Sequence, residues 1–485
     1  MGYIKKIQNM LTGGEITCVE LTKKYLEAIK TDNKELNAYV TVTEEEALAT
    51  AQKVDEKIAR GEELLPLEGV PMTLKDNIST KGIETTCCSK ILSGYKPIYN
   101  ATVWDILKNQ NAVLLGKTNM DEFAMGSSCE TSCFGGAMNP HNTCYVSGGS
   151  SGGVASAVAG DIAVFGLGSD TGGSIRQPAS FCGIVGLKPT YGAVSRYGLV
   201  AYASSLDQIG PITKTVEDTA IVFDNISVYD KKDSTSCNKN ISPTVDTLDK
   251  DIKGKKIGIA REYLDGVRDD VKESILAAAE KYKELGAEIV YFDLPALKFA
   301  LPVYYILACA EASSNLGRYD GIRYGYKTEH YEGTHDMICR TRSEGFGDEV
   351  KRRILLGTYV LSAGYYDAYY KKAQNLRGTI IKAFEDAFEN VDVILAPTVP
   401  MTAFEKGKAT SDPVETYLTD ICTVPINIAG LPSVSIPCGF NSNGMPIGMQ
   451  IIGKKFDEAT ILNVAYKYEQ VCPENFKDTK WGVKL

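Results

Sequence analysis

Apolar positions follow helical spacing in some segments of the chain and form short continuous runs in others. Val19, Leu21, Leu26 and Ile29 recur at near-helical spacing, so we expect an amphipathic helix over residues 17–31. The pattern predicts further helices over residues 44–60, 152–160 and 267–285. Short apolar runs predict buried strands over residues 67–74, 111–115, 162–167, 256–260, 288–292, 391–396, 433–436 and 448–452.

The alternation of these elements predicts an α/β protein. We expect one large domain over residues 1–485, with a central mixed β-sheet flanked by helices on both faces. The core of that domain is expected at residues 65–215. Residues 225–255 are polar and predict a surface loop between two halves of the chain.

Composition and charge argue against membranes and nucleic acid as direct binding partners. The 485 residues are 44% hydrophobic and 23% charged, which is typical of a soluble globular protein. No apolar run is long enough for a membrane-spanning helix and the first residues lack a signal-peptide core, so we expect a cytoplasmic protein that binds no membrane. A net charge of −9 argues against direct binding of nucleic acid, because phosphate contacts need a basic surface.

Thirteen cysteines are scattered along the chain, and the expectation is free thiols in a reducing compartment. Cys129, Cys133 and Cys144 lie close together, and a metal site is one interpretation of them. Their spacing fits no CxxC pair, so buried or loop cysteines are favoured and no metal is expected.

Two glycine-rich segments each carry a serine after a pair of glycines. Residues 148–153 are GGSSGG, and residues 169–178 are SDTGGSIRQP. Backbone without side chains next to a hydroxyl can bring several N–H groups to a reacting carbonyl, which points to acyl-transfer chemistry. A phosphate-binding loop is a weaker interpretation of residues 148–153, because the segment lacks the Gly-Lys-Ser/Thr ending of a P-loop.

A serine nucleophile needs a base, and histidine is the usual one. The chain has only three histidines, and none lies in a context that suggests a triad. Lys75 ends the apolar run 67–74, where partial desolvation would lower its pKa and leave a neutral amine to accept a proton. The alternative is an ordinary surface lysine after a strand.

Ser174 is the candidate nucleophile. The backbone N–H groups of Thr171, Gly172, Gly173 and Ser174 itself would form an oxyanion hole. Ser150 is the candidate relay between that serine and the lysine. The structural alternatives are a glycine-rich turn chosen for its conformation and an N-cap for the helix that follows.

These motifs together resemble the amidase signature family, over almost the whole chain. The match rests on Lys75 and on residues 119–128, 148–153, 170–176, 195–211 and 349–354. The first, fourth and fifth of these ranges resemble the branch whose members are glutamine-hydrolysing subunits of tRNA-dependent amidotransferases. The joint occurrence is specific, whereas a Gly-Gly-Ser match alone would be weak.

The resemblance implies a Ser–cis-Ser–Lys triad in an amidase signature fold. Ser174 would be the nucleophile, Ser150 the cis-serine and Lys75 the base. A glutamyl ester would form as ammonia leaves, and water would then hydrolyse it.

The resemblance also implies contacts to free glutamine. Arg353 would bind the α-carboxylate through its planar fork, and Arg352 beside it is the weaker choice. Asp420 would bind the α-ammonium, and Tyr304 would add a polar contact. The structural alternatives are a surface arginine on a helix and a capping or turn aspartate.

The family further implies a heterotrimer. A B subunit would bind mischarged Glu-tRNA(Gln) or Asp-tRNA(Asn) and use ATP and Mg²⁺, a small C subunit would wrap the pair, and this chain would need no cofactor. A stand-alone amidase acting on a small amide is the alternative, and a non-catalytic scaffold is the third interpretation.

The chain departs from the family pattern just before the first serine segment. His141, Tyr145 and Ser147 stand where the family usually carries Trp, Arg and Pro. The departures concern the packing of that loop and contacts with partners rather than the triad.

Overall fold

One mixed β-sheet runs through the protein and draws strands from most of its length. The structure is a computed structural model, which describes residues 2–239, 241–408 and 417–485. Its strands are β1 (Tyr39–Val42), β2 (Pro71–Lys75), β3 (Val113–Thr118), β4 (Met138–Asn139), β5 (Asn142–Val146), β6 (Phe165–Asp170), β7 (Val185–Lys188), β8 (Gln208–Thr213), β9 (Lys256–Ala260), β10 (Glu288–Phe292), β11 (Val393–Pro397), β12 (Ser433–Phe440) and β13 (Pro446–Ile452). Eleven of them form the sheet, in the order β1-β3-β2-β6-β8-β7-β12-β13-β11-β9-β10, while β4 and β5 pair separately.

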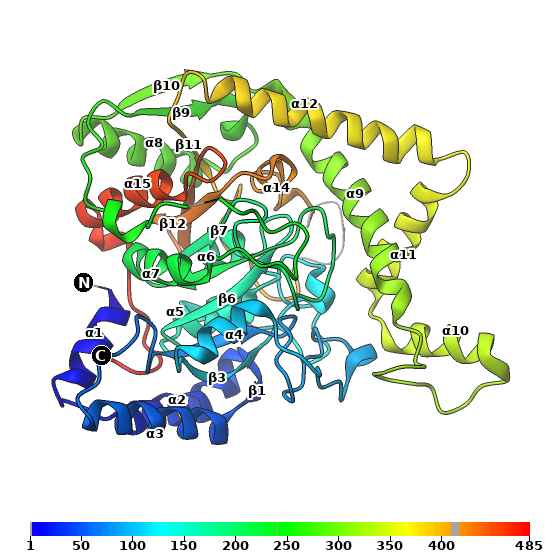
Figure 1. The fold of residues 1–485 in the computed structure, drawn as a ribbon. Helices are drawn as coiled ribbons and strands as arrows, with labels where there is room; N and C mark the ends of the chain where they lie inside the picture. The colour runs from blue at the N-terminus through cyan, green and yellow to red at the C-terminus, as the bar shows by residue number, and fades with distance from the viewer. Residues whose placement is uncertain (1, 240, 409–416) are drawn as a thin grey trace.

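Helices cover the sheet and extend beyond it (Figure 1). The described α-helices are α1 (Tyr3–Thr12), α2 (Cys18–Leu36), α3 (Glu44–Ala59), α4 (Thr102–Asn109), α5 (Gly152–Ala159), α6 (Arg176–Phe181), α7 (Val216–Ile226), α8 (Asp269–Glu284), α9 (Ala300–Asn315), α10 (Gly333–Gly345), α11 (Asp348–Leu361), α12 (Lys372–Ala387), α14 (Val424–Ala429) and α15 (Glu458–Val471). Parallel and antiparallel pairs both occur in the sheet, so the prediction of an α/β protein with a central mixed sheet is confirmed.

Most predicted elements form, and their boundaries move for local reasons. The helix expected from residue 17 begins after Thr17, which makes a reciprocal capping box with Glu20. The strand expected over 67–74 begins only at Pro71, because Gly69 has a left-handed φ of 76°. The strand expected over 162–167 instead runs over β6 and carries Asp170 at its end.

The sheet brings β2 and β6 together as parallel neighbours. Parallel strands end at the same edge of a sheet, so Lys75 at the end of β2 and Asp170 at the end of β6 reach the same place. Every residue of both strands is buried. The topology therefore gathers two of the motifs at one sheet edge.

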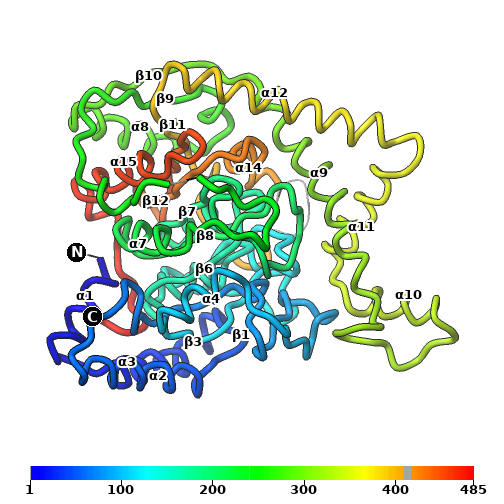
Figure 2. The backbone as a smooth tube through the Cα atoms, in the orientation of Figure 1, coloured from blue at the N-terminus to red at the C-terminus, as the bar shows by residue number. Residues whose placement is uncertain are grey.

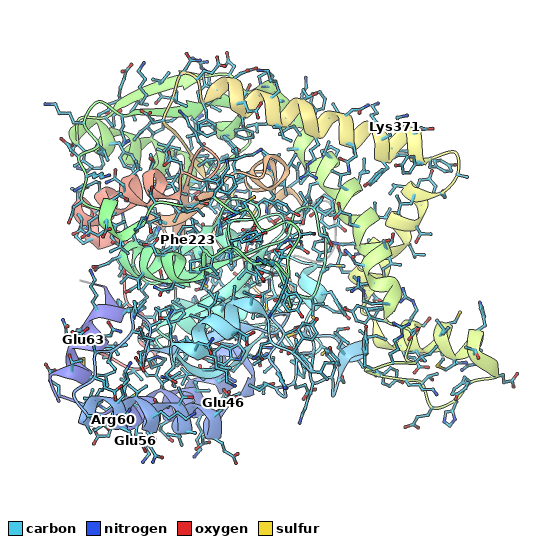
Figure 3. The ribbon with its side chains drawn as sticks, in the orientation of Figure 1. Glu46, Glu56, Arg60, Glu63, Phe223 and Lys371 are labelled. Carbon is cyan, nitrogen blue, oxygen red and sulfur yellow. The ribbon has the colours of Figure 1, made fainter. Side chains whose placement is uncertain are left out.

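The described apolar side chains form two large core clusters and one small one, and some charged side chains, Lys75 and Arg176 among them, are buried as well. Phe223 of α7 is fully buried, and Figure 3 shows it within the body of the molecule, while Glu56 and Arg60 of α3 and its flank lie at the periphery. Figure 2 shows the two termini on the same side, where Lys6 Nζ donates a hydrogen bond of 2.8 Å to the carbonyl of Leu485. Because one sheet includes strands from Tyr39 to Ile452, we infer that the chain forms a single domain.

Helices α9 to α12 extend from one side of the sheet, at the right of Figure 1. The helical stretch Pro295–Arg318, which contains α9, is the one described stretch long and apolar enough to cross a membrane by length and composition, and half of its most apolar window is buried. It packs against α11, and a Cβ at Gly357 of α11 would lie 1.9 Å from the backbone oxygen of Cys309 in α9. Only glycine permits this approach.

Gly357→Ala is therefore expected to lower the free energy of unfolding by about 1–3 kcal/mol, since the two helices must separate to admit the methyl group. Gly378→Ala is the matched control, because it also lies in a helix but has no atom near its Cβ position. The control should be stabilising by roughly 0.5–1 kcal/mol. Urea denaturation of both variants checks the pair, and equal effects would contradict the close packing.

Candidate active site

Lys75 and Ser150 meet at the buried edge of the sheet. A hydrogen bond of 2.7 Å joins Lys75 Nζ to Ser150 Oγ, and both residues are fully buried. The Gly149–Ser150 peptide bond is cis. Lys75 Nζ also lies 3.0 Å from Ser169 Oγ and donates to the Ser169 carbonyl at 3.3 Å. The amine is thus held on one side by Ser169 and faces the serine of the first glycine-rich segment on the other.

Burial controls the proton affinity of this lysine. Desolvation lowers the pKa of Lys75 to about 8, against the opposing effect of nearby carboxylates, of which Asp121 is the largest. A sizeable fraction of the amine is then neutral near neutral pH. Such an amine can accept a proton from a hydroxyl at hydrogen-bond distance.

Ser174 lies in the loop between β6 and α6 and is 8% exposed, more than the lysine or Ser150. Its carbonyl accepts a hydrogen bond of 3.1 Å from the backbone N–H of Ser151, which ties the two serine segments together. The Ser174 hydroxyl has no hydrogen-bond partner within the described residues. The step that would pass a proton from Ser174 to Ser150 therefore stays a prediction.

The structure leaves fewer free N–H donors for the oxyanion hole than the sequence predicts. The N–H of Gly173 donates to Asp170 Oδ1 at 2.8 Å, so in this structure it is not free for an oxyanion. In the described parts of the chain, the N–H groups of Thr171, Gly172 and Ser174 have no hydrogen-bond partner. These three remain the predicted donors.

A buried ion pair shapes the loop that carries Ser174. Asp170 accepts hydrogen bonds from the N–H of Ile175 at 3.1 Å and from Arg176 at 3.1 Å, and neither ionic side chain is exposed. Arg176 keeps the pKa of the Asp170 carboxyl low, at about 2, although burial alone would raise it. The carboxylate therefore stays ionised and holds the backbone of the loop.

Tyr304 and Asp420 approach the same loop from other elements. A Cβ at Gly172 would lie 2.5 Å from Tyr304 Cζ, so the phenol ring of this α9 residue packs directly on the glycine. Thr423 Oγ1 donates to the Gly172 carbonyl at 2.6 Å, and its N–H donates to the carbonyl of Asp420 at 3.0 Å. Burial raises the pKa of Asp420 to about 7, although the positive charge of Arg353 lowers it.

The two adjacent arginines of α11 face opposite ways. Arg353 is 4% exposed and donates through Nε to Glu349 Oε1 at 2.7 Å and through Nη1 to Tyr202 Oη at 2.5 Å. Arg352 has a side chain 43% exposed and pairs with Glu349 at the surface. The buried residue of the two is thus Arg353, the one that the sequence favoured.

The residues that depart from the family pattern lie outside this constellation. His141 Nε2 contacts the Cys182 carbonyl at 3.1 Å, and Ser147 Oγ donates to the Gly148 carbonyl at 3.2 Å. Tyr145 forms an isolated bridge with Glu405. These contacts support the loop before Gly148 and do not touch Lys75 or the two serines.

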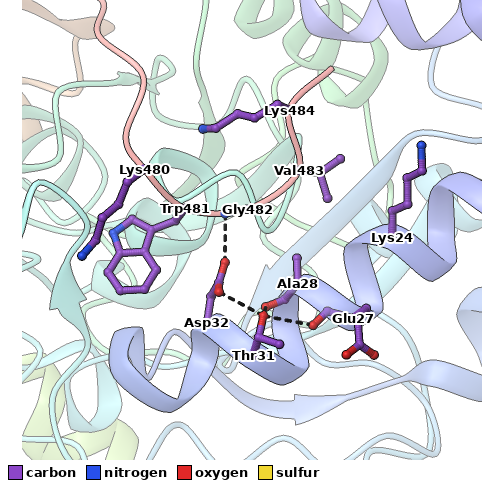
Figure 4. A pocket seen from close by; sticks show the side chains of 10 residues that line it. All are labelled: Lys24, Glu27, Ala28, Thr31, Asp32, Lys480, Trp481, Gly482, Val483 and Lys484. Atoms are coloured by element: carbon purple, nitrogen blue, oxygen red, sulfur yellow. Dashed lines mark hydrogen bonds between the residues drawn. The ribbon is translucent and has the colours of Figure 1, made fainter.

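Other features of the chain do not add a second centre. Among the described residues no group of three or more His, Cys, Asp or Glu side chains is arranged to hold a metal ion, and Cys129 is buried while Cys133 and Cys144 are exposed. A hollow of about 660 Å³ lies between α2 and the C-terminal segment (Figure 4). Two of its lining residues are joined by a hydrogen bond of 2.8 Å from the Gly482 N–H to Asp32, and none of the predicted site residues lines it.

Sequence reasoning missed several residues that complete the site. Ser169 and the Asp170–Arg176 pair lie inside the quoted motif, but nothing in their spacing reveals their partners. Glu349 lies four residues before Arg353 on one helix, and this i,i+4 spacing is the signal that could have found it. Helix α9 was not predicted, and a helix at Arg353, which lies in α11, was considered only as a structural alternative.

The rate at which a sulfonyl fluoride inactivates the protein should rise about tenfold per pH unit below the pKa of Lys75, which is about 8, and level off above it. The sign follows from the requirement for a neutral amine, which protonation removes. Lys75→Met should abolish this dependence and slow inactivation about 10²–10⁴-fold. A wild-type rate that stays constant between pH 6 and 9 would contradict the role of the lysine.

Comparisons with known proteins cover nearly the whole chain. The amidase family model matches residues 20–462. The chain is 55% identical over 480 residues to the A subunit of glutamyl-tRNA(Gln) amidotransferase from Thermoanaerobacter pseudethanolicus, covering 99% of this chain and 98% of the relative. It is 51% identical to the protein of the same name from Thermosynechococcus vestitus, covering 98% of each.

Solved structures show the same fold. The crystal structure of the A subunit of glutamyl-tRNA(Gln) amidotransferase from Thermotoga maritima is 40% identical, with a TM-score of 0.79 over 96% of this chain and 97% of that one. A bacterial aryl acylamidase of the amidase signature enzymes is 25% identical, with a TM-score of 0.85 over 98% and 97% of the two chains. Since the family model and the relatives span nearly its whole length, the chain belongs to the amidase signature family.

Proposed function

We propose that this protein is the glutamine-hydrolysing A subunit of a tRNA-dependent amidotransferase, which releases ammonia to convert Glu-tRNA(Gln), Asp-tRNA(Asn) or both. The observation that carries the proposal is that the buried Arg353 and the partly buried Asp420 both contact Tyr305, while Thr423, bonded to the Asp420 carbonyl, donates to the Gly172 carbonyl in the loop of Ser174. A buried guanidinium and a carboxylate offer opposite charges to the two ends of an α-amino acid. Relatives that share half or more of its residues bear the name of this subunit.

The proposed reaction uses groups that the chain itself supplies. Ser174 Oγ attacks the side-chain amide carbon of glutamine while its proton passes through Ser150 to the neutral amine of Lys75. The N–H groups of Thr171, Gly172 and Ser174 stabilise the oxyanion. The tetrahedral intermediate collapses as the relay returns a proton to the leaving nitrogen, giving ammonia and a glutamyl ester.

The second half of the reaction reverses the relay. Lys75, through Ser150, removes a proton from water, which attacks the ester carbonyl. Ser174 Oγ leaves and takes that proton back, and glutamate is released. Arg353 holds the α-carboxylate, Asp420 the α-ammonium, and the Tyr304 hydroxyl gives a further polar contact over Gly172.

The name of the relatives implies other subunits. We propose a B subunit that binds the mischarged tRNA and uses ATP and Mg²⁺ to activate its carboxylate, and a small C subunit that wraps the pair. The net charge of −9 is consistent with a chain that leaves tRNA to its partner. This role places the protein in the cytoplasm with the rest of translation.

Ser174→Ala in the assembled complex is expected to abolish glutamine-dependent transamidation, with a loss of about 10³-fold or more, because the attacking oxygen is gone. Ammonium-dependent transamidation should persist, since it needs no amide hydrolysis. Formation of amidated tRNA is measured with each nitrogen donor. Undiminished ammonia release from glutamine by the variant would refute the proposal.

Arg353→Lys is expected to raise KM for glutamine by about 10-fold or more, since a lysine cannot offer the planar bidentate fork. Arg340→Lys is the matched control and should leave KM unchanged, because the exposed Arg340 pairs with Asp336 and does not contact Glu349. A stand-alone amidase would instead turn over simple primary amides without a preference for glutamine. Steady-state hydrolysis of glutamine and of propionamide by both variants separates the two functions.

A further inference from the structure

The guanidinium of Arg353 is enclosed by tyrosine rings from three different segments. Its Cζ lies 5.6 Å from the ring centroid of Tyr202, 5.3 Å from that of Tyr305 and 5.5 Å from that of Tyr417. Each distance is within the range of a cation–π contact. Three rings hold the cation in one place and exclude water from much of its surface.

Hydrogen bonds fix the rotation of the same guanidinium. Nε donates to Glu349 Oε1 and Nη1 donates to Tyr202 Oη, which occupies two of its three nitrogens. Within the described residues Nη2 has no hydrogen-bond partner. The edge of the guanidinium that remains free for a ligand carboxylate therefore depends on Glu349, which accepts the bond from Nε.

One carboxylate oxygen joins Arg353 to the segment that carries Asp420. Glu349 Oε1 accepts from Arg353 Nε at 2.7 Å and from Tyr417 Oη at 2.8 Å. The Glu349 side chain is only 14% exposed, so both bonds are partly shielded from water. Bonds to an ionised acceptor are stronger than those between neutral groups.

The connection continues from Tyr417 to Asp420. The rings of Tyr417 and Tyr305 stack with centroids 4.1 Å apart and planes at 30°. Tyr305 Oη in turn donates to Asp420 Oδ2 at 3.1 Å. The cation and the anion of the site are thus linked through a shared oxygen, a ring stack and a phenol.

We propose that Glu349 and Tyr417 are positioning residues that orient the Arg353 guanidinium toward the α-carboxylate of the substrate. Through the ring stack on Tyr305 they also fix the separation of the guanidinium from Asp420. The pair thereby makes the site selective for an amide that carries both α-charges. This inference rests on the proposed hydrolysis of glutamine and assigns the selectivity to residues that need not touch the substrate.

Three amide substrates distinguish the contact of Arg353 with the α-carboxylate from the contact of Asp420 with the α-ammonium. Glutamine carries both α-charges, glutaramate keeps the carboxylate without the ammonium, and 4-aminobutanamide keeps the ammonium without the carboxylate. The native complex is assayed with each amide for ammonia release. A defect in the orientation of Arg353 should affect only the two amides that carry a carboxylate.

Tyr417→Phe keeps the ring stack and removes the hydrogen bond to Glu349. We expect KM for glutamine and for glutaramate to rise about 10-fold, the loss associated with one bond to a charged group. KM for 4-aminobutanamide and kcat for all three should stay within about twofold, because the triad is untouched. Tyr331→Phe, on an exposed tyrosine, is the matched control and should change nothing.

Glu349→Ala should show the same pattern with a larger rise in KM, since it frees Arg353 Nε and Tyr417 Oη together, along with the exposed Arg352. The double variant Glu349→Ala/Tyr417→Phe should be no worse than Glu349→Ala alone, because both changes remove the same bond at Oε1. Asp348→Ala, whose side chain is 90% exposed, is the control on the same helix. Thermal unfolding of each variant verifies that it is folded.

The outcomes distinguish a failure of the positioning role from a failure of the proposed function. Folded variants with unchanged KM, an equal rise in KM for all three amides, or additive effects in the double variant overturn the positioning role while glutamine hydrolysis by the wild type stands. A wild-type complex that releases no ammonia from glutamine overturns the proposed function itself.

Discussion

The buried ion pair between Asp170 and Arg176 is the constraint on which the site depends. Asp170 ends β6 and holds the N–H groups of Gly173 and Ile175, so it sets the backbone that presents Ser174. Arg176 reaches Gln450 Oε1 on β13 at 3.0 Å and the carbonyl of Thr423 at 3.3 Å. Removing one partner of such a pair typically costs about 3–5 kcal/mol, because the other charge is left buried alone. The nucleophile loop and the segment with Asp420 are therefore held by the same two side chains.

The residues proposed for catalysis and those proposed for recognition of the substrate come from different parts of the fold. The sheet edge supplies Lys75 and the two serines, all in rigid and buried surroundings. Helices α9 and α11, which extend from the sheet, supply Tyr304 and Arg353. We propose that the sheet edge provides a general means of cleaving amides, while side chains of the helices select which amide is cleaved. This division is consistent with a family whose solved members include an amidotransferase protein that shares 40% of its residues and an aryl acylamidase that shares 25%.

The sequence could predict the sheet and the triad candidates because both leave local signals. Strands 256–260 and 288–292 were predicted to the residue, since each is a short apolar run between polar residues. Ser150 was the candidate relay to Lys75 from the residues themselves, the resemblance implied the same pair, and the two side chains lie 2.7 Å apart. The partners of Asp170 could not be predicted, because Arg176 and Asn427 reach it only in the folded chain. The oxyanion prediction included Gly173 because a sequence does not show that Asp170 occupies its N–H.

The central claim is that Ser174 attacks a glutamine side chain held by Arg353 and Asp420. A glutamine analogue with a chloromethyl ketone in place of the side-chain amide tests it directly, with peptide mapping of the modified protein by mass spectrometry. The account predicts one covalent adduct, on Ser174, whose formation excess L-glutamine suppresses. An adduct on Ser150 or on a cysteine, or no adduct in a folded complex, would contradict it.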